Sequence, residues 1–273
     1  TTFPGWEHVA PVGDEHGRIT QRVLTFTDIS ALRVAESKVR HLAFHDALTG
    51  LGNRHQLRES LSTLNNGAAA CLMFLDLDGF KVINDSLGHD AGDRLLVVIA
   101  RRIECLLRQG DVAIRLGGDE FVLLIQSVGI ERMAAVAQRV LEAVRAPVDM
   151  PPGGSVQVSA SLGIAMFPRD GADADALLRS ADIAMYAAKA GGRNRYAYYE
   201  PSMAQIANER LAIEQGLMQA MENGELTLHW QPQVDLDSRR VVGAEALLRW
   251  NNEEHGMVSP AKFIPLAEDT RLI

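Results

Sequence analysis

The segment that most constrains the fold is 115–121, which reads Arg-Leu-Gly-Gly-Asp-Glu-Phe. Apolar residues lead into it over 112–116 and continue after it over 121–125. Two apolar runs separated by a short glycine-containing turn form the pattern of a β-hairpin. The sequence therefore predicts a hairpin with polar residues at its tip.

The tip of this predicted hairpin combines two glycines with two carboxylates. Gly117 and Gly118 have no Cβ atom, so a ligand can lie close against their backbone. The adjacent carboxylates of Asp119 and Glu120 repel each other unless a cation or a bound partner compensates. Taken alone, the pair is either a solvated acidic turn or part of a binding site. A second acidic cluster upstream favours the binding site.

The second cluster begins at Asp76, directly after the apolar run 68–75. An apolar run of this kind bounded by charge is typical of a buried central strand, and α/β folds place their chemistry at the C-terminal ends of such strands. Asp76 and Asp119 together could supply two hard oxygen ligands to Mg²⁺, which completes its coordination with water and substrate phosphates. The pattern indicates a phosphoryl- or nucleotidyl-transfer site.

Several motifs, in one order along the chain, resemble the GGDEF domain of the diguanylate cyclase family. The hairpin segment 117–121 carries the signature Gly-Gly-Asp-Glu-Phe without substitution. The other matching segments are 46–54, 74–81, 84–85, 88–93, 181–186, 189 and 192–194. Together they extend over most of the first 200 residues, so we expect a complete catalytic domain.

The resemblance implies an α+β fold, a mixed central sheet with flanking helices that is similar to nucleotidyl cyclases and polymerase palm domains. Periodicity predicts helices over 53–64, 92–107, 130–146 and 173–190. It predicts strands over 69–76, 112–116, 121–125, 156–166 and 195–199. Helices and strands do not alternate strictly, which fits the α+β class.

The resemblance also implies metal-binding and catalytic roles. Asp76 would bind Mg²⁺ or Mn²⁺ through its side chain, Leu77 through its backbone carbonyl, and Asp119 would complete the protein ligands. Glu120 would lie near the ribose 3′-hydroxyl. Because an ordinary carboxylate is a weak base for a hydroxyl, metal coordination must supply most of the activation. Whether Glu120 removes the proton or only orients the ribose stays open.

Substrate contacts are implied at further matching positions. Asn84 and Asp93 would read the guanine edge, because an amide donates and a carboxylate accepts. Without the resemblance, the residues favour a simpler interpretation, in which Asn84 is a helix-boundary residue and Asp93 a negative charge at the N-terminus of the following helix. The remaining implied contacts, to phosphates and to the nearby backbone, are Phe80, Lys81, Gly117, Gly118, Lys189 and Arg193.

A possible regulatory site precedes the hairpin. Residues 108–111 have the form Arg-x-x-Asp, and in the resembled family this spacing marks an inhibitory site for the product, cyclic di-GMP. Arg108 can fork onto guanine or phosphate, and Asp111 can accept from the guanine edge. Arg139 matches a further contact position. The four-residue pattern is common by itself, so this prediction depends on its placement.

The chain changes character after residue 200. A helical pattern over 209–222 and strands over 226–234 and 241–250 resemble the beginning of an EAL domain, the cyclic di-GMP phosphodiesterase family. The matching residues include Gln231, the metal-ligand position Glu245 and the phosphate-contact position Arg249. That family folds as a TIM-type barrel of typically ~250 residues. The truncated start present here lacks the later ligands, so we expect no phosphodiesterase activity from it.

We divide the chain into four parts. Residues 1–30, with a strand over 19–26, resemble the C-terminal end of a PAS sensor domain. Residues 31–45 are predicted to form a helix, either an ordinary docking helix or a signalling linker that pairs in a dimer. The diguanylate cyclase domain occupies 46–200, and the EAL fragment occupies 201–273.

Composition limits the partners. The net charge of −8 and the pI near 5.5 argue against nucleic-acid binding and against contact with an anionic membrane. Cys71 and Cys105 lie in apolar segments and are predicted to be buried free thiols of a cytoplasmic protein. No apolar run approaches the ~20 residues of a membrane span. The chain does not begin with Met, so we expect a piece of a longer protein, which could itself carry a membrane anchor.

The sequence thus predicts a diguanylate cyclase that condenses two GTP molecules into cyclic di-GMP and two pyrophosphates. Because each module holds one GTP, the active species would be a homodimer. The alternative is a catalytically silent module that binds GTP or cyclic di-GMP and regulates an EAL phosphodiesterase. A nucleic-acid polymerase, suggested by the palm analogy, is disfavoured because the sequence shows no basic groove.

Overall fold

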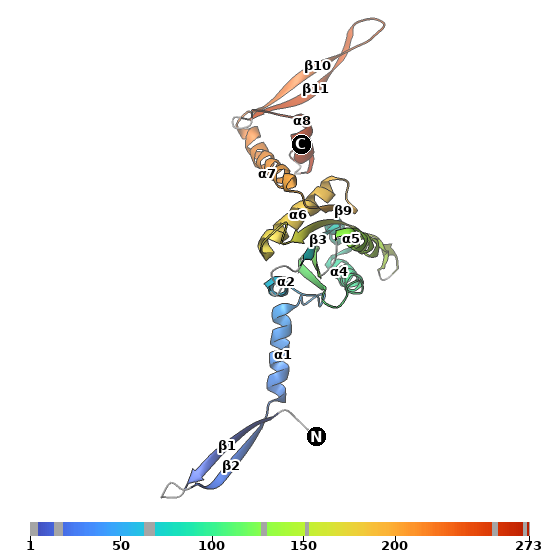
Figure 1. Ribbon diagram of the computed structural model, residues 1–273. Coiled ribbons are helices and arrows are strands. Elements are labelled where there is room, and N and C mark those ends of the chain that lie inside the picture. Colours follow the sequence, from blue (N-terminus) through green and yellow to red (C-terminus); the bar gives the residue numbers. More distant parts are fainter. Residues whose placement is uncertain are drawn as a thin grey trace. The chain divides into compact units, whose positions relative to one another are not determined.

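The chain divides into two compact units, unit 1 over 1–199 and unit 2 over 200–273 (Figure 1). Each unit is described by itself. The computed structural model describes residues 5–13, 19–62, 69–126, 130–150, 153–252, 256–269 and 272.

A five-stranded mixed sheet forms the centre of unit 1. In spatial order its strands are β4 (Val112–Gly117), β5 (Glu120–Gln126), β3 (Ala70–Asp78), β8 (Ser159–Phe167) and β9 (Arg195–Tyr198). The first four pair antiparallel, and β8 pairs with β9 in parallel. The mixed sheet confirms the predicted α+β class.

Helices cover both faces of this sheet (Figure 1). Met73 and Leu75 of β3 belong to one buried cluster, which includes residues of α3 (Phe80–Leu87), α4 (His89–Glu104) and α5 (Ile130–Arg145). Leu72 and Phe74 belong to the other, with residues of α2 (Arg54–Ser62) and α6 (Ala174–Ala190). Alternation along β3 therefore assigns successive residues to opposite faces. Each fully buried leucine contributes about 1.5–3 kcal/mol.

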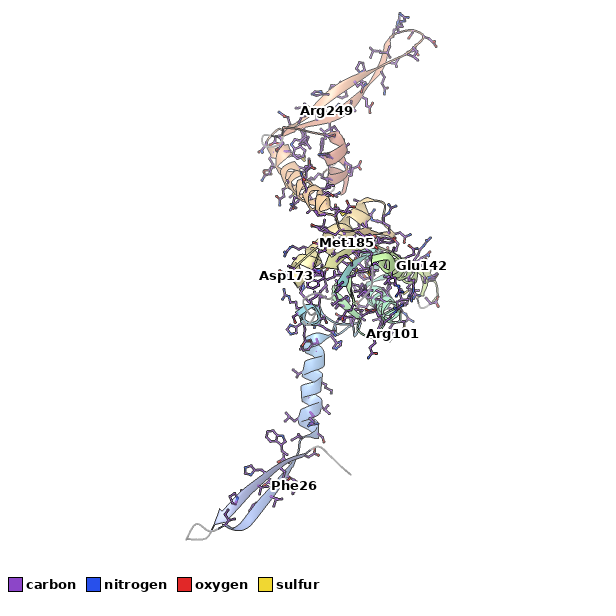
Figure 2. The ribbon with its side chains drawn as sticks, viewed as in Figure 1. Phe26, Arg101, Glu142, Asp173, Met185 and Arg249 are labelled. Atoms are coloured by element: carbon purple, nitrogen blue, oxygen red, sulfur yellow. The ribbon has the colours of Figure 1, made fainter. Side chains whose placement is uncertain are left out.

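The close approach of α6 to β8 depends on one glycine. A Cβ atom at Gly163 would lie 1.9 Å from the carbonyl oxygen of Ala181 and 2.2 Å from the amide nitrogen of Met185. Asp173 caps the start of α6, where its carboxylate accepts the N–H of Ala176 at 2.8 Å (Figure 2). Gly191 follows the last residue of the helix, as predicted. Helix α6 therefore packs directly against the sheet, and it begins after the capping residue Asp173 and ends before Gly191.

Two predictions for unit 1 need correction. The helix predicted over 92–107 is α4, which begins at His89 and ends at Glu104, and the short α3 before it was not predicted. The Asn, Asp and Ser residues of α3 have weak helix propensity, and the segment ends at Gly88. The strand predicted over 156–166 is interrupted, because Val156 ends β7 (Ser155–Val156), which pairs with β6 (Val148–Asp149), and β8 begins at Ser159. The last two residues of the helix predicted over 53–64 lie outside the described residues.

The N-terminal segment forms a two-stranded hairpin and a helix. β1 (Gly5–Gly13), which was not predicted, pairs antiparallel with β2 (Ile19–Asp28), and α1 (Ser30–Phe44) follows. Four large apolar side chains of α1 are exposed: Leu32, Val34, Val39 and Leu42. An apolar surface of this kind is compatible with the predicted pairing helix. The assignment of the hairpin to a PAS domain stays a prediction.

Unit 2 is built on a small antiparallel sheet. Its elements are α7 (Pro201–Glu222), β10 (Leu226–Val234), β11 (Val241–Asn252), β12 (Gly256–Val258) and α8 (Pro260–Asp269). Trp250 and Phe263 form its core with ring centroids 5.5 Å apart, and the Trp250 indole donates to Glu225 at 2.8 Å. Its described strands form no closed barrel, which follows from the truncation.

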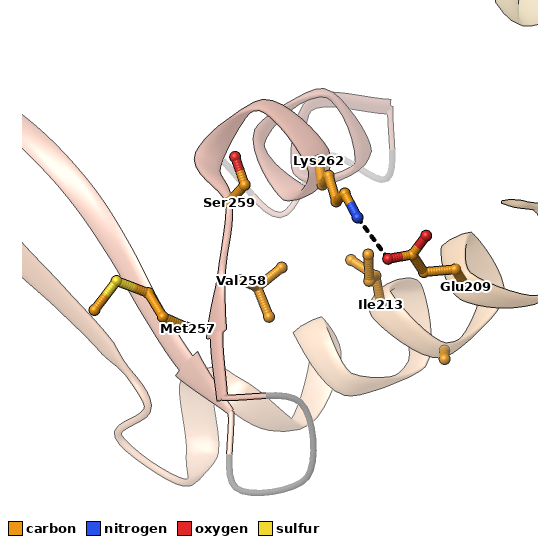
Figure 3. A pocket seen from close by; sticks show the side chains of 7 residues that line it. Glu209, Ile213, Met257, Val258, Ser259 and Lys262 are labelled. Carbon is orange, nitrogen blue, oxygen red and sulfur yellow. Dashed lines mark hydrogen bonds and ion pairs between the residues drawn. The ribbon is translucent and has the colours of Figure 1, made fainter.

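A pocket of about 350 Å³ lies in unit 2 between α7 and the segment that contains β12 and the start of α8 (Figure 3). An ion pair between Glu209 and Lys262 spans it. Both side chains are about half exposed, at 52% and 54%, so this pair contributes little to stability.

Two composition-based predictions can be compared with the structure. Among the described residues, no helix is both long and apolar enough to cross a membrane. Both cysteines are free, and burial raises the pKa of Cys71 to about 12. The prediction that Cys105 is buried is wrong, because α4 ends one residue before it and the thiol is exposed.

Candidate active site

The predicted hairpin is present, with its tip at Gly118 and Asp119 between β4 and β5. Gly117 has φ 148° and Gly118 has φ 51°. Both values are unfavourable for residues with a Cβ atom. A Cβ atom at either position would meet nothing within 4 Å, so the backbone conformation, rather than crowding, requires glycine here. The tip is therefore open to a ligand.

Arg115 holds this tip in place. Its Nε and Nη2 atoms donate to the carbonyl oxygen of Gly118 at 3.0 and 2.8 Å, and Nη1 lies 3.1 Å from Asp46. Asp46 in turn accepts the N–H and hydroxyl of Thr49. Burial raises the pKa of Asp46, but the hydrogen bonds from Thr49 and Arg115 outweigh it and lower the pKa overall. Sequence reasoning missed Arg115, whose only signal is a basic residue inside an apolar strand.

Three carboxylates, those of Asp76, Asp119 and Glu120, come together where β3 ends and β5 begins. Asp76 and Glu120 lie directly opposite each other in the antiparallel pair. Burial raises the pKa of Asp76, and the nearby charges of Asp119 and Asp78 raise it further. Burial, followed by the charges of Asp182, Asp76 and Asp119, also raises the pKa of Glu120. This concentration of negative charge is unfavourable without a cation.

Lys189 already supplies one positive charge to this cluster. Its Nζ atom lies 2.7 Å from Asp76, and both side chains are mostly shielded from solvent. Lys189 lies in the last turn of α6, and Asp182 lies near the middle of the same helix. A divalent cation bound by Asp76 would therefore lie beside this ammonium group or displace it.

The donor set fits a hard cation. Within the described part of the chain, no three His, Cys, Asp or Glu side chains form a metal-binding group. The predicted set needs only two carboxylates, Asp76 and Asp119, and one backbone carbonyl. Leu77 lies one residue beyond the last pairing of β3 with β5. The raised pKa of Asp76 and the cation already paired with it indicate that these oxygen ligands suit Mg²⁺ or Mn²⁺.

Asp78 is a structural residue that sequence reasoning did not single out. Its carboxylate accepts hydrogen bonds from Ser159 at 2.7 Å, Ser161 at 2.8 Å and the backbone N–H of Asn194 at 3.2 Å. Asn194 and Arg193 both have positive φ, 49° and 59°. Such a backbone is costly for residues other than glycine and needs support from its surroundings. Asp78 therefore helps to hold the loop that carries the predicted phosphate contact Arg193.

The predicted guanine contacts lie on neighbouring helices. Asn84 is in α3 and Asp93, which is exposed, is in the second turn of α4. The Oδ1 atom of Asn84 is buried and has no hydrogen-bond partner among the described residues. A Cβ atom at Gly92 would lie 1.9 Å from it, so glycine is needed beside Asp93. A buried amide oxygen without a partner is costly, which suits a residue kept for a ligand.

The predicted phosphate contacts Phe80 and Lys81 form the first turn of α3, with Gly79 at the N-cap in a left-handed conformation. The first N–H groups of a helix have no partner within it and favour anions. The α3 N-terminus directly follows the Asp76 cluster in the chain. The structure therefore brings Phe80 and Lys81 to the same end of β3 as the carboxylates.

The predicted inhibitory site lies on the turn between α4 and β4. Both carboxylate oxygens of Asp111 accept backbone hydrogen bonds at 3.1 Å, one from Arg108 and one from Gln126. The Arg108 side chain is exposed, and so is Arg139 on α5. In the described residues, no hydrogen bond or ion pair joins Arg139 to the turn. Asp111 thus has a structural role that the sequence did not indicate.

The EAL-like residues of unit 2 lie on one hairpin. Gln231 of β10 and Glu245 of β11 are direct partners across the antiparallel pair. Arg249 lies further along β11, where it donates to the carbonyl oxygen of Leu248 (Figure 2). Glu245 is exposed, and among the described residues it belongs to no group of three potential metal ligands.

Comparison with known families decides the relationship. The family model described as diguanylate cyclase, GGDEF domain, matches residues 43–195. The chain belongs to the GGDEF family. The EAL domain model matches residues 214–273, so the GGDEF module is followed by the beginning of an EAL domain. The resemblance seen in the motifs is confirmed.

The curated relatives are longer than this chain. The bifunctional diguanylate cyclase/cyclic di-GMP phosphodiesterase MucR of Pseudomonas aeruginosa is 41% identical over 249 residues, which cover 89% of this chain and 36% of MucR. The cyclic di-GMP phosphodiesterase PdeR of Escherichia coli is 38% identical over 252 residues, covering 90% of this chain and 38% of PdeR. The chain thus spans little more than a third of the length of these relatives.

Solved GGDEF domains have the same fold. The GGDEF domain of TpbB (YfiN) from Pseudomonas aeruginosa is 38% identical, with a TM-score of 0.57 that covers 60% of this chain and 99% of that one. The coiled coil and GGDEF domain of DgcB from Caulobacter crescentus, solved with c-di-GMP, is 28% identical with a TM-score of 0.58, covering 62% of this chain and 93% of that one.

Proposed function

We propose that the GGDEF module, residues 46–200, is a diguanylate cyclase that condenses two GTP molecules into cyclic di-GMP and two pyrophosphates. The observation that carries this proposal is the convergence of Asp76, Asp119 and Glu120 at one end of the sheet. The intact signature, the name of MucR and the c-di-GMP in the DgcB structure support it.

We assign the binding of GTP to groups on both sides of this cluster. Asn84 and Asp93 would hold the guanine, and the first turn of α3 with Lys189 and Arg193 would hold the phosphates. Asp76 and Asp119, with the Leu77 carbonyl, would hold Mg²⁺ or Mn²⁺. A bound divalent ion would polarise the phosphates and offset the charge of the leaving pyrophosphate.

Glu120 would then act on the ribose of the same GTP. Its raised pKa makes the carboxylate a better base than an ordinary glutamate. The 3′-oxygen forms a bond to the α-phosphorus of a second GTP, the bond from that phosphorus to the pyrophosphate oxygen breaks, and the hydroxyl proton passes to Glu120. Each module holds one nucleotide, so two modules must face each other. We therefore propose a homodimer, for which the exposed apolar residues of α1 offer a pairing surface.

Product inhibition would act through Arg108, Asp111 and Arg139. Because Asp111 already fixes the turn, Arg108 is the cleaner residue to replace. We expect Arg108→Ala to raise the steady-state yield of cyclic di-GMP. The measurement is the initial rate with increasing added cyclic di-GMP, and unchanged inhibition would remove this assignment.

A second candidate is a silent GGDEF module that binds nucleotide and regulates an EAL domain. It is favoured by the name of PdeR, a phosphodiesterase with 38% identity. Incubation of the chain with GTP and Mg²⁺ separates the candidates. Formation of cyclic di-GMP supports the cyclase, and GTP binding without turnover supports the regulator.

A further inference from the structure

We propose that a charged cleft between α2 and α6 receives the α-phosphate of the GTP held by the partner module. This inference rests on the proposed function, because it concerns the second substrate of that reaction. The cleft has a volume of about 470 Å³, and Glu120 is part of its lining. Three arginines also line it, Arg54, Arg58 and Arg179, together with the carboxylates of Asp175 and Asp182.

The cleft lies on the opposite face of the sheet from the proposed guanine contacts. Its floor includes Phe74, and Leu178 of α6 lines its wall; both belong to the buried cluster that involves α2 and α6. Asn84 and Asp93 come from α3 and α4, whose buried residues belong to the other cluster. Asp76 lies two residues after Phe74 on β3, so the proposed metal site shares this face of the sheet with the cleft. The guanine of the module's own nucleotide would lie on the other face.

The arginines of the cleft are available to an anion. Arg58 pairs with Asp175 at 3.1 Å, but both side chains are more than half exposed, so the pair is weak. Within the described residues, Arg54 and Arg179 have no ion-pair partner. Arg54 lines the same cleft as Glu120. The guanidinium groups of Arg54 and Arg179 are therefore near the proposed base without an ion pair of their own in the described residues.

The chemistry of the step requires cations at this position. Phosphoryl transfer spreads negative charge over the non-bridging oxygens of the attacked phosphorus. Lys81, Lys189 and Arg193 are assigned to the module's own nucleotide, so other cations must meet the incoming one. Guanidinium groups bind phosphate oxygens in pairs, and Arg54 and Arg58 are four residues apart on one helix, which places them on one face. The arginines of the cleft have the charge and the position for this role.

Two measurements on Arg54→Ala and Arg179→Ala test the inference. The first is the initial rate of cyclic di-GMP formation at saturating GTP and Mg²⁺. The second is the equilibrium binding of 3′-deoxy-GTP, which lacks the attacking hydroxyl and reports on the module's own site. Arg132→Ala, an exposed arginine on α5, is the matched control. Thermal unfolding of every variant checks that it folds.

We expect both cleft variants to lose about 10- to 100-fold in kcat, the size of a lost hydrogen bond to a charged group. Binding of 3′-deoxy-GTP should stay within about twofold of the unaltered chain, as for a surface substitution. Arg179→Lys keeps the positive charge but not the two-pronged geometry of the guanidinium group. Its kcat should lie between that of the unaltered chain and that of Arg179→Ala.

Three outcomes would overturn the inference. Rates equal to that of Arg132→Ala would show that the cleft has no part in the reaction. Loss of 3′-deoxy-GTP binding in proportion to the rate would assign the arginines to the module's own nucleotide. If the unaltered chain forms no cyclic di-GMP, both the proposed function and this inference fail. If the unaltered chain turns over and the rates of the cleft variants are unchanged, only this inference fails.

Discussion

Strand β3 of unit 1 and strand β11 of unit 2 both carry a carboxylate that the sequence assigns to a metal site, Asp76 and Glu245. β3 has a neighbouring strand on each side and helices on both faces, and most of its residues are buried. β11 is largely exposed over its first half. Asp76 is surrounded by Asp119, Glu120 and Lys189, all distant in sequence. The difference shows that a matching motif gives a site only where packing brings the other groups to it.

The sharpest way to test this comparison is to remove one carboxylate from each unit. Asp119→Ala should abolish formation of cyclic di-GMP, with a loss of about 10³-fold or more, because the proposed metal site loses a ligand. Glu245→Ala should leave the rate unchanged, because Glu245 belongs to unit 2 and has no part in the proposed cyclase site. Initial rates with GTP and Mg²⁺ measure both. Equal losses would contradict the comparison.

The core of unit 2 can be compared with its exposed strands in the same way. Trp250→Ala should destabilise unit 2 by about 3–5 kcal/mol, because it leaves a cavity and removes the hydrogen bond to Glu225. Trp230 is 64% exposed on β10, so Trp230→Ala is the matched control with a small effect. Amide hydrogen exchange in α7 and α8 measures the change. Similar protection in both variants would contradict the assignment of the core.

The next prediction compares two ion pairs of unit 1. Arg115 is 11% exposed and holds the hairpin tip, whereas Arg169, which pairs with Asp170, is 58% exposed. Arg115→Ala should lower kcat by about 10- to 100-fold, because a small displacement of the tip misplaces Asp119 and Glu120. Arg169→Ala should have almost no effect. Equal rates for Arg115→Ala and Arg169→Ala would show that the hairpin tip does not depend on Arg115.

The smallest expected effect concerns the unfavourable charge of the site. Burial raises the pKa of Asp182, so the folded protein holds this proton more tightly than the unfolded chain does. The resulting stability is complete below the ordinary value of 3.8 and is lost as pH rises through the folded pKa.

Asp182→Asn removes the loss of folding stability that follows ionisation of Asp182. The variant should therefore be more stable near pH 7, with a rise of about 2–4 °C in the unfolding midpoint for each kcal/mol gained. The gain should disappear near pH 3.8. Asp175→Asn, on the same helix but about half exposed, is the control. A gain that persists at low pH would mean that charge is not its cause.

Local pattern was enough for much of this structure. The hairpin, the buried strand that ends near Asp76 and the end of α6 at Gly191 all follow from residues next to one another. What could not be predicted depends on contacts between distant segments. Examples are the bond from Asp78 to the backbone of Asn194 and the pairing of Asp46 with Arg115. Neither has a local signature, because each partner is an ordinary polar residue until the fold brings the two together.

The central claim is that Asp76 and Asp119 bind one divalent cation together. Mn²⁺ binding in the presence of 3′-deoxy-GTP, followed by electron paramagnetic resonance, tests it without any turnover. We predict that Asp76→Asn and Asp119→Asn each weaken Mn²⁺ binding by about 10-fold or more, while Glu245→Gln does not change it. Mn²⁺ affinity that is unchanged in both unit 1 variants would contradict the claim.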